Sequence, residues 1–302
     1  MKAKKILEIY LKDLELQRFS SRTIRNYRTV LNAFISFLES ENVEEIENIT
    51  SAHIKAYIGS KGKNKATYIN GIIKRIKVFF KWCLEEEYIE RDVSKKIKSL
   101  KEEKTVITIF NDKEMKELLE YYSKDDYISV RNRSIMYLLC ETGIRALEVC
   151  KLKLESIKGD YLLIDGKGNK QRVVPITNIL RKQLNRYFKA RSKFAKEEDW
   201  LFLSRRHKQL TTQTIEVIVK EASENCNIRS EVRCSPHTLR HFMAVSNLKN
   251  GMDLFTLSKL LGHEDIKVTE KYLQSMTNEE ILELSKNSSN LEKLNMKIMV
   301  KK

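Results

Sequence analysis

The chain has few of the residues that interrupt helices. Its 302 residues include only two prolines and nine glycines. Because these two residue types most often end or break a regular helix, their scarcity favours long helices and few strands. A chain of this length is expected to form two domains, each large enough to bury a core of its own.

Long apolar runs are also missing. Charged residues interrupt the first segment, MKAKKILEIYLKDLELQ, every few positions, which excludes the apolar core of a signal peptide. No later run is long enough to cross a bilayer. We therefore expect a cytoplasmic protein that has no association with a membrane.

The cysteines fit neither a disulfide framework nor a metal site. They number five, an odd set without a CxxC pair, so we expect reduced thiols. Zinc is an alternative, because Cys226, Cys234, His237 and His241 are near neighbours in the sequence. Their spacing lacks the short Cys–Cys knuckle of structural zinc sites, and no acidic cluster suggests another metal, so we expect no cofactor.

Acidic residues are outnumbered by basic ones. Lysine and arginine total 57 against 41 aspartates and glutamates, a net charge of +16 that is spread along the chain. Such a distribution favours an extended acidic partner, with nucleic acid as the leading candidate. On charge alone, a lysine-rich surface that only keeps the protein soluble explains the excess equally well.

The first third of the chain is predicted to be a small helical bundle, over residues 1–93. Apolar residues recur at helical spacing in segments 21–38 and 66–84, and Arg22, Arg25 and Arg28 fall on a separate, basic side of the first segment. The next segment, 94–106 (SKKIKSLKEEKTV), is dense in charge and poor in large apolar residues. It is therefore predicted to be an exposed linker.

A second domain is predicted over residues 107–285, followed by a polar tail over 286–302. The segment YLLIDGKGNKQRVVPI (161–176) has two β-rich runs around a glycine-rich turn, which predicts a hairpin with Lys167 and Lys170 at its tip. Ser235 and Pro236 are typical of a helix start, and a short apolar helix follows Asp253. This helix pair could form a helix-turn-helix, but a recognition helix would be polar, so we rank that interpretation lower.

Three short segments carry the candidate chemistry. In SPHTLRHFMAV, His237 and Arg240 lie three residues apart and share one helix face, where they could hold an anion together. TGIRALEV places Arg145 at a helix start with Glu148 one turn later to brace it, and GHEDIKVTEKY adds a histidine and a tyrosine. A lone helical histidine is more often structural, so the weight lies in the set. The tyrosine follows a polar segment with no apolar period, which argues against a purely core role.

In this order, TGIR, GKGNK, HTLRH, LLGH and a tyrosine nine residues after the last histidine resemble the catalytic domain of the tyrosine recombinases, the phage-integrase family. The predicted bundle resembles the SAM-like core-binding domain of that family. The resemblance implies a mainly α fold with a small β-hairpin or sheet: an N-terminal helical bundle and a mixed α+β catalytic domain. It places the six catalytic positions on Arg145, Lys167, His237, Arg240, His263 and Tyr272.

Two features depart from the family pattern or compete with it. Phe242 and Met243 stand where relatives commonly have a small hydroxyl residue and then phenylalanine, a change that alters packing behind the helix. Lys170 is a rival for the hairpin lysine, although the resemblance favours Lys167 at the glycine-flanked tip.

The resemblance implies a site-specific DNA recombinase that cuts and rejoins DNA through a 3′-phosphotyrosyl intermediate, without metal or ATP. Its uses would be DNA integration and excision, for a phage or other mobile element, or the resolution of chromosome dimers. The implied partners are double-stranded DNA, a homotetramer in the synaptic complex and accessory recombination proteins.

The residue types suit this chemistry independently of the family. Two guanidiniums match the extra negative charge of a pentacoordinate phosphorus with planar, permanently charged donors. A phenol, with an ordinary pKa near 10, leaves more readily than an alkoxide, so its phosphate ester conserves the bond energy. A flexible lysine suits the acid that protonates the departing 5′ oxygen.

Two other functions are compatible with these residues. A type IB topoisomerase-like enzyme would use the same groups but would relax supercoils as a monomer. A DNA-binding regulator with a retired active site is the second alternative. The complete set of six residues argues against a regulator, because a pure binder gains nothing from Lys167 and Tyr272.

Overall fold

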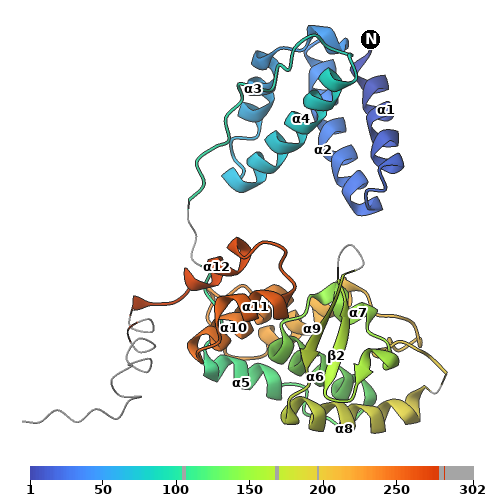
Figure 1. Cartoon of the computed structure of the whole chain (residues 1–302), viewed down its shortest axis with the longest axis vertical. Coiled ribbons are helices and arrows are strands. Elements are labelled where there is room, and N and C mark those ends of the chain that lie inside the picture. Colours follow the sequence, from blue (N-terminus) through green and yellow to red (C-terminus); the bar gives the residue numbers. More distant parts are fainter. Residues whose placement is uncertain (104–106, 167–169, 196, 279–281, 283–302) are drawn as a thin grey trace, which may run out of the picture. The chain divides into compact units, whose positions relative to one another are not determined.

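The structure, a computed structural model, describes residues 1–103, 107–166, 170–195, 197–278 and 282. Within these ranges the chain is mainly helical, with one three-stranded antiparallel sheet, as Figure 1 shows. This confirms the predicted fold class. The described helices include none that combines the length and the apolar character needed to span a membrane. The chain divides into two compact units, Met1–Thr105 and Val106–Lys302.

Over its described residues, the first unit is a bundle of four α-helices and one short 3-10 helix. They are α1 (Ala3–Leu16), α2 (Ser21–Ser40), η1 (Ile46–Asn48), α3 (Ser51–Ser60) and α4 (Ala66–Glu85). The Ser20 side chain caps α2 by accepting the backbone N–H of Thr23. The apolar faces of the helices meet in one core, where Tyr10 packs edge-on against Tyr27 and Phe79.

Part of the predicted linker packs on this unit. Ile97 is buried in the core of the bundle, and the side chain of Asn70 hydrogen-bonds to both backbone groups of Leu100. The segment has few apolar residues, so its composition did not indicate that the single residue Ile97 would be buried and hold the segment on the bundle. The predicted domain ranges otherwise remain predictions, and the predicted C-terminal tail lies outside the described residues.

Within the described residues, the second unit has eight α-helices, one 3-10 helix and three strands. In chain order these are α5 (Asp112–Glu120), α6 (Tyr127–Thr142), α7 (Ala146–Lys151), η2 (Leu154–Ser156), β1 (Ile157–Lys158), β2 (Tyr161–Asp165), β3 (Gln171–Pro175), α8 (Asn178–Phe194), α9 (Thr212–Glu224), α10 (Pro236–Lys249), α11 (Leu254–Leu261) and α12 (Lys267–Leu273). Strands β2 and β3 form the predicted hairpin, in a register that pairs Tyr161 with Pro175. The short strand β1 was not predicted, because two residues carry too little periodicity to be recognised.

Two local features position the candidate site. Helix α6 ends at Gly143, whose φ of 60° is left-handed and suits glycine. A Cβ on Gly143 would lie 2.9 Å from both Met243 of α10 and Leu261 of α11, so these helices approach the turn closely. Helices α10, α11 and α12 lie together, shown in orange and red in Figure 1, and share a core of their own. This packing brings the segments around Arg145, Arg240 and His263 to one place.

Candidate active site

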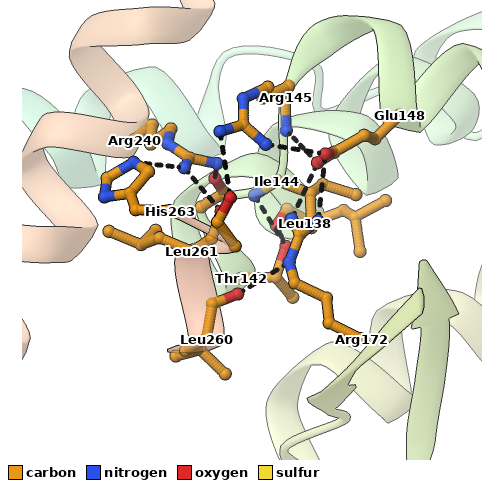
Figure 2. Close-up of polar contacts among 12 residues, drawn as sticks. Leu138, Thr142, Ile144, Arg145, Glu148, Arg172, Arg240, Leu260, Leu261 and His263 are labelled. Carbon is orange, nitrogen blue, oxygen red and sulfur yellow. Dashed lines mark hydrogen bonds and ion pairs between the residues drawn. The ribbon is translucent and has the colours of Figure 1, made fainter. Parts of the chain in front are cut away.

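Arg145 begins helix α7 and is braced by the carboxylate of Glu148, as the sequence predicted. The backbone N–H of Arg145 donates to Oε2 of Glu148 at 2.8 Å, and its Nη1 donates to Oε1 at 2.9 Å. The first bond caps the start of α7, because the carboxylate of Glu148 accepts the free N–H of the residue that precedes the helix (Figure 2). The side chain of Arg145 stays 45% exposed, so part of its guanidinium remains open to a ligand.

Glu148 holds a second arginine, which the sequence analysis missed. From β3, Arg172 donates to both carboxylate oxygens of Glu148 at 2.9 and 2.7 Å, and its Nε donates to the carbonyl of Leu260 at 2.8 Å. Burial alone would raise the pKa of Glu148, but the hydrogen bonds and charges of the two arginines outweigh it and lower that pKa. The sequence signal was an arginine at the start of the apolar run RVVPI.

Arg240 projects from α10 and is almost entirely buried, at 3% exposure. Its Nη1 donates to the carbonyl of Gly143 at 2.6 Å, and its Nη2 donates to the carbonyl of Leu261 at 2.7 Å. Burial, and then the nearby charge of Arg145, lowers the pKa of Arg240, while the phenol of Tyr272 raises it. The buried guanidinium is therefore fixed by backbone carbonyls from two other helices.

The two predicted arginines meet at the end of helix α11. Arg240 donates to the carbonyl of Leu261, and Arg145 donates to the next carbonyl, that of Gly262, at 3.4 Å. Figure 2 shows both guanidiniums at this turn. Carbonyls at a helix C-terminus have no partner within the helix and carry partial negative charge, which suits cationic donors.

His263 lies between Arg240 and helix α12. Its Nε2 is 2.8 Å from Nη2 of Arg240, and its Nδ1 is 2.8 Å from Oγ1 of Thr269. A guanidinium can only donate, so Nε2 is the acceptor and the ring proton is on Nδ1. Burial, followed by the charges of Arg240 and Arg145, lowers the pKa of His263 to about 4, so the ring is neutral near pH 7.

His237 and a further histidine line the same side of α10. The rings of His237 and His241 meet edge-on with centroids 4.6 Å apart. Burial lowers the pKa of both rings, and the charge of Arg240 contributes to each shift; the pKa of His241 falls to about 4. His241 stands in the motif HTLRH but is not among the predicted site residues. Its buried Nδ1 has no hydrogen-bond partner among the described residues.

Tyr272 is more buried than the polar segment before it suggested. Its side chain is 3% exposed and belongs to the core shared by α10, α11 and α12. The ring meets His241 edge-on at 4.6 Å and stacks beside His263 at 6.1 Å. The polar segment gave no sign of this burial, because the ring is covered by residues of α10 and α11 and not by its sequence neighbours.

Only one of the two candidate lysines, Lys170, lies within the described residues. Lys167 lies outside the described residues. Lys170 pairs with Glu264 at 2.9 Å, and both side chains are exposed. Among the residues that the structure describes, no group of three or more histidine, cysteine or acidic side chains could hold a metal ion.

The arrangement forms a cationic site for an anion. Arg145, Arg240, His237 and His263 lie close enough for their charges to affect one another, and Tyr272 borders them. The guanidinium of Arg145 is partly exposed and that of Arg240 is buried. An anion bound at Arg145 would therefore lie next to a second guanidinium that is held inside the protein. Such preorganised donors suit charge that develops during a reaction at phosphorus.

Comparison with known proteins gives two matching family models. The phage integrase family matches residues 108–279, and the phage integrase N-terminal SAM-like domain matches residues 7–87. Tyrosine recombinase XerD of Staphylococcus saprophyticus is 32% identical over 275 residues, covering 88% of this chain and 92% of the relative. XerD of Staphylococcus haemolyticus is 30% identical over 276 residues, with the same coverage of 88% and 92%.

Solved structures share the fold. XerH site-specific recombinase bound to its palindromic difH substrate has a TM-score of 0.75 at 21% identity, covering 95% of this chain and 84% of that chain. A lambda integrase tetramer bound to a Holliday junction has a TM-score of 0.76 at 18% identity, covering 90% of this chain and 77% of that chain.

Proposed function

The chain belongs to the phage integrase family of tyrosine recombinases, and from this membership we propose that it is a site-specific DNA recombinase. It cuts one DNA strand, holds the cut end as a 3′-phosphotyrosyl link and rejoins it to a partner strand, for integration, excision or dimer resolution. The observation that carries the proposal is the meeting of Arg145 and Arg240 at consecutive carbonyls of one helix end, with Tyr272 beside them.

The proposed substrate is double-stranded DNA, and four copies act together on two sites. The net charge of +16 favours binding to phosphates along both units. A homotetramer follows from the exchange of two strand pairs, which needs four nucleophiles, and the related lambda integrase is a tetramer on a Holliday junction. The proposed place of action is the cytoplasm, where accessory recombination proteins would act with it.

In the proposed first step, the oxygen of Tyr272 attacks the scissile phosphorus. The new phosphorus–phenol oxygen bond forms as the bond from phosphorus to the 5′ oxygen breaks. Arg145 and Arg240 stabilise the extra charge on the non-bridging oxygens. Lys167 protonates the departing 5′ oxygen, and His237 assists removal of the phenol proton.

The second step reverses the first with a different strand. A 5′ hydroxyl from the partner duplex attacks the phosphotyrosyl phosphorus, and the phenol of Tyr272 leaves. No ATP is consumed, because the phenol ester keeps the energy of the original bond. Since the Tyr272 side chain is 3% exposed, we infer that α12 shifts before the attack, so that a phosphate can reach the phenol.

The decisive experiment replaces the nucleophile. Tyr272→Phe should abolish an SDS-stable covalent adduct on nicked suicide duplexes drawn from a random-sequence pool, while DNA binding measured by gel shift persists. Tyr161→Phe is the matched control, because Tyr161 is 42% exposed on β2 and should form the adduct normally.

Sequencing the DNA trapped by the unsubstituted protein would identify the site for later assays. An adduct that persists in Tyr272→Phe would refute the assignment of the nucleophile. Supercoil relaxation by a monomer, without exchange between two sites, would instead favour the topoisomerase-like function. Binding without any adduct in the unsubstituted protein would favour a regulator.

A further inference from the structure

Thr269 links the helix of the proposed nucleophile to Arg240. It lies one turn before Tyr272 on α12, is fully buried, and contacts Nδ1 of His263 at 2.8 Å. On the other side of the ring, Nε2 of His263 accepts from Nη2 of Arg240 at 2.8 Å. One imidazole therefore connects the nucleophile helix to the buried arginine.

The partners of His263 determine its tautomer. Because Arg240 has only donors, Nε2 must supply its lone pair and Nδ1 must carry the proton. Nδ1–H then donates to Oγ1 of Thr269, so in this state the hydroxyl acts as the acceptor. Neither ring nitrogen has an N–H left for a phosphate.

In this tautomer, His263 also takes up a hydrogen-bond donor of Arg240. Its Nη2 carries two hydrogens, and these are directed to the carbonyl of Leu261 and to His263. A phosphate oxygen close to Nη2 would compete with Nε2 of His263 for the same hydrogen. If the ring proton moved to Nε2, by exchange with solvent, both Nε2–H and the released Arg240 N–H could donate to that oxygen.

A hydroxyl suits both tautomers because it can accept or donate. We propose that Thr269 is a positioning residue whose hydroxyl pairs with Nδ1 of His263 in either tautomer: Nε2 accepts from Arg240 before DNA binds and donates to a phosphate oxygen afterwards. Without the hydroxyl, Nδ1 of the partly buried His263 ring would lack this partner in both states. The phosphate role of His263 rests on the proposed function, whereas the tautomer before DNA binding does not.

The first test reads the tautomer directly in the full chain without DNA. The chain has five histidines, so nitrogen-15 NMR can resolve each ring, with Tyr272 left unchanged. His263 should show a protonated Nδ1 and an unprotonated Nε2. Thr269→Val, which keeps the shape but removes the hydroxyl, should change this signature, whereas Thr269→Ser should preserve it.

The second test measures the rate at which the covalent adduct forms on the DNA site that was identified by sequencing the trapped DNA. Thr269→Val should slow it about tenfold, the factor expected when one hydrogen bond is lost, and Thr269→Ser should stay within about threefold. Unchanged signals from His53 in α3 and His207 would show that both units remain folded. Thr269→Ala serves as a second hydroxyl-free variant if the valine does not fold.

Three results would overturn the inference. These are an unchanged His263 signature in the hydroxyl-free variants, an unchanged rate in them, or an equal loss of rate in Thr269→Ser, which would indicate a packing role. If the unsubstituted protein formed no adduct, the proposed function would fail. The NMR signature would still decide whether Thr269 determines the tautomer of His263.

Discussion

The two arginines of the candidate site are the same residue type held in opposite ways. Arg145 is 45% exposed and is fixed by a carboxylate, which itself belongs to an ion pair with Arg172 of the hairpin. Arg240 is 3% exposed and is fixed by the carbonyls of Gly143 and Leu261 and by a neutral histidine. We call these the Arg145 half and the Arg240 half.

The difference shows how one site can combine access with rigidity. A buried guanidinium without partners would be costly, and the helix-end carbonyls supply partners that cannot move away. The exposed guanidinium depends instead on Glu148, whose carboxylate also ties the hairpin to α7. The Arg240 half is therefore part of the core, while the Arg145 half is a surface held in place by charge.

The largest expected effect separates the halves by stability. Arg240→Met should reduce the free energy of unfolding of the second unit by about 3 kcal/mol, because it leaves buried acceptors unpaired. Arg145→Met should cost about 1 kcal/mol or less, since Glu148 keeps its pair with Arg172. Both variants should lose the covalent adduct.

The two tryptophans allow each unit to be followed separately. Trp82 belongs to the first unit and Trp200 to the second, so a Trp82→Phe background leaves Trp200 to report urea unfolding of the second unit. Equal losses of stability in the two arginine variants would show that the halves do not differ as described.

A smaller effect is expected from pH. His241 has an ordinary pKa near 6.5 when unfolded and about 4 when folded, because of burial first and then the positive charges around it. The unfolded state therefore binds more protons between pH 6.5 and 4, and stability is lost as pH falls through that window. Lowering pH from 7 to 5 should cost about 2 kcal/mol through His241.

The Arg145 half should respond only in stronger acid. Glu148 has a lowered pKa, so its contribution is present above its unfolded value and is lost as pH falls through the folded one. His241→Gln should therefore make the decline in the urea midpoint between pH 7 and 5 shallower without abolishing it, because His263 has a similarly lowered pKa. Glu148→Gln should leave that decline unchanged. The opposite pattern would contradict the assignment of pH sensitivity to the buried histidine next to the Arg240 half.

The smallest effect tests the edge of the Arg145 half. Lys170 and Glu264 form an exposed ion pair, so Lys170→Ala should change stability by no more than about 0.5 kcal/mol. Adduct formation should also persist, because Lys167 is the proposed acid. Lys167→Ala is the matched variant and should abolish strand cleavage, as a gel assay would show. The reverse outcome would transfer the role to Lys170.

The site was only partly predictable, and its local features were the predictable part. Glu148 lies one turn after Arg145, so its bracing contact follows from helix geometry. Arg172 and Thr269 were missed because their partners come from other elements: Glu148 is 24 positions before Arg172, and His263 meets Thr269 across the turn before α12. Burial of Tyr272 was also missed, since the neighbours that cover it lie mainly on α10 and α11.

The sequence by itself determined the helical character, the hairpin and the family, because periodicity, capping residues and ordered motifs are local or strictly linear features. Only the tertiary structure decided that one arginine is buried and the other exposed, and that a hydroxyl on α12 faces His263. The bond from Arg240 to Gly143 spans 97 positions and that from Arg145 to Gly262 spans 117. The physical reason is that burial and hydrogen-bond partners depend on how distant helices pack, which no single segment encodes.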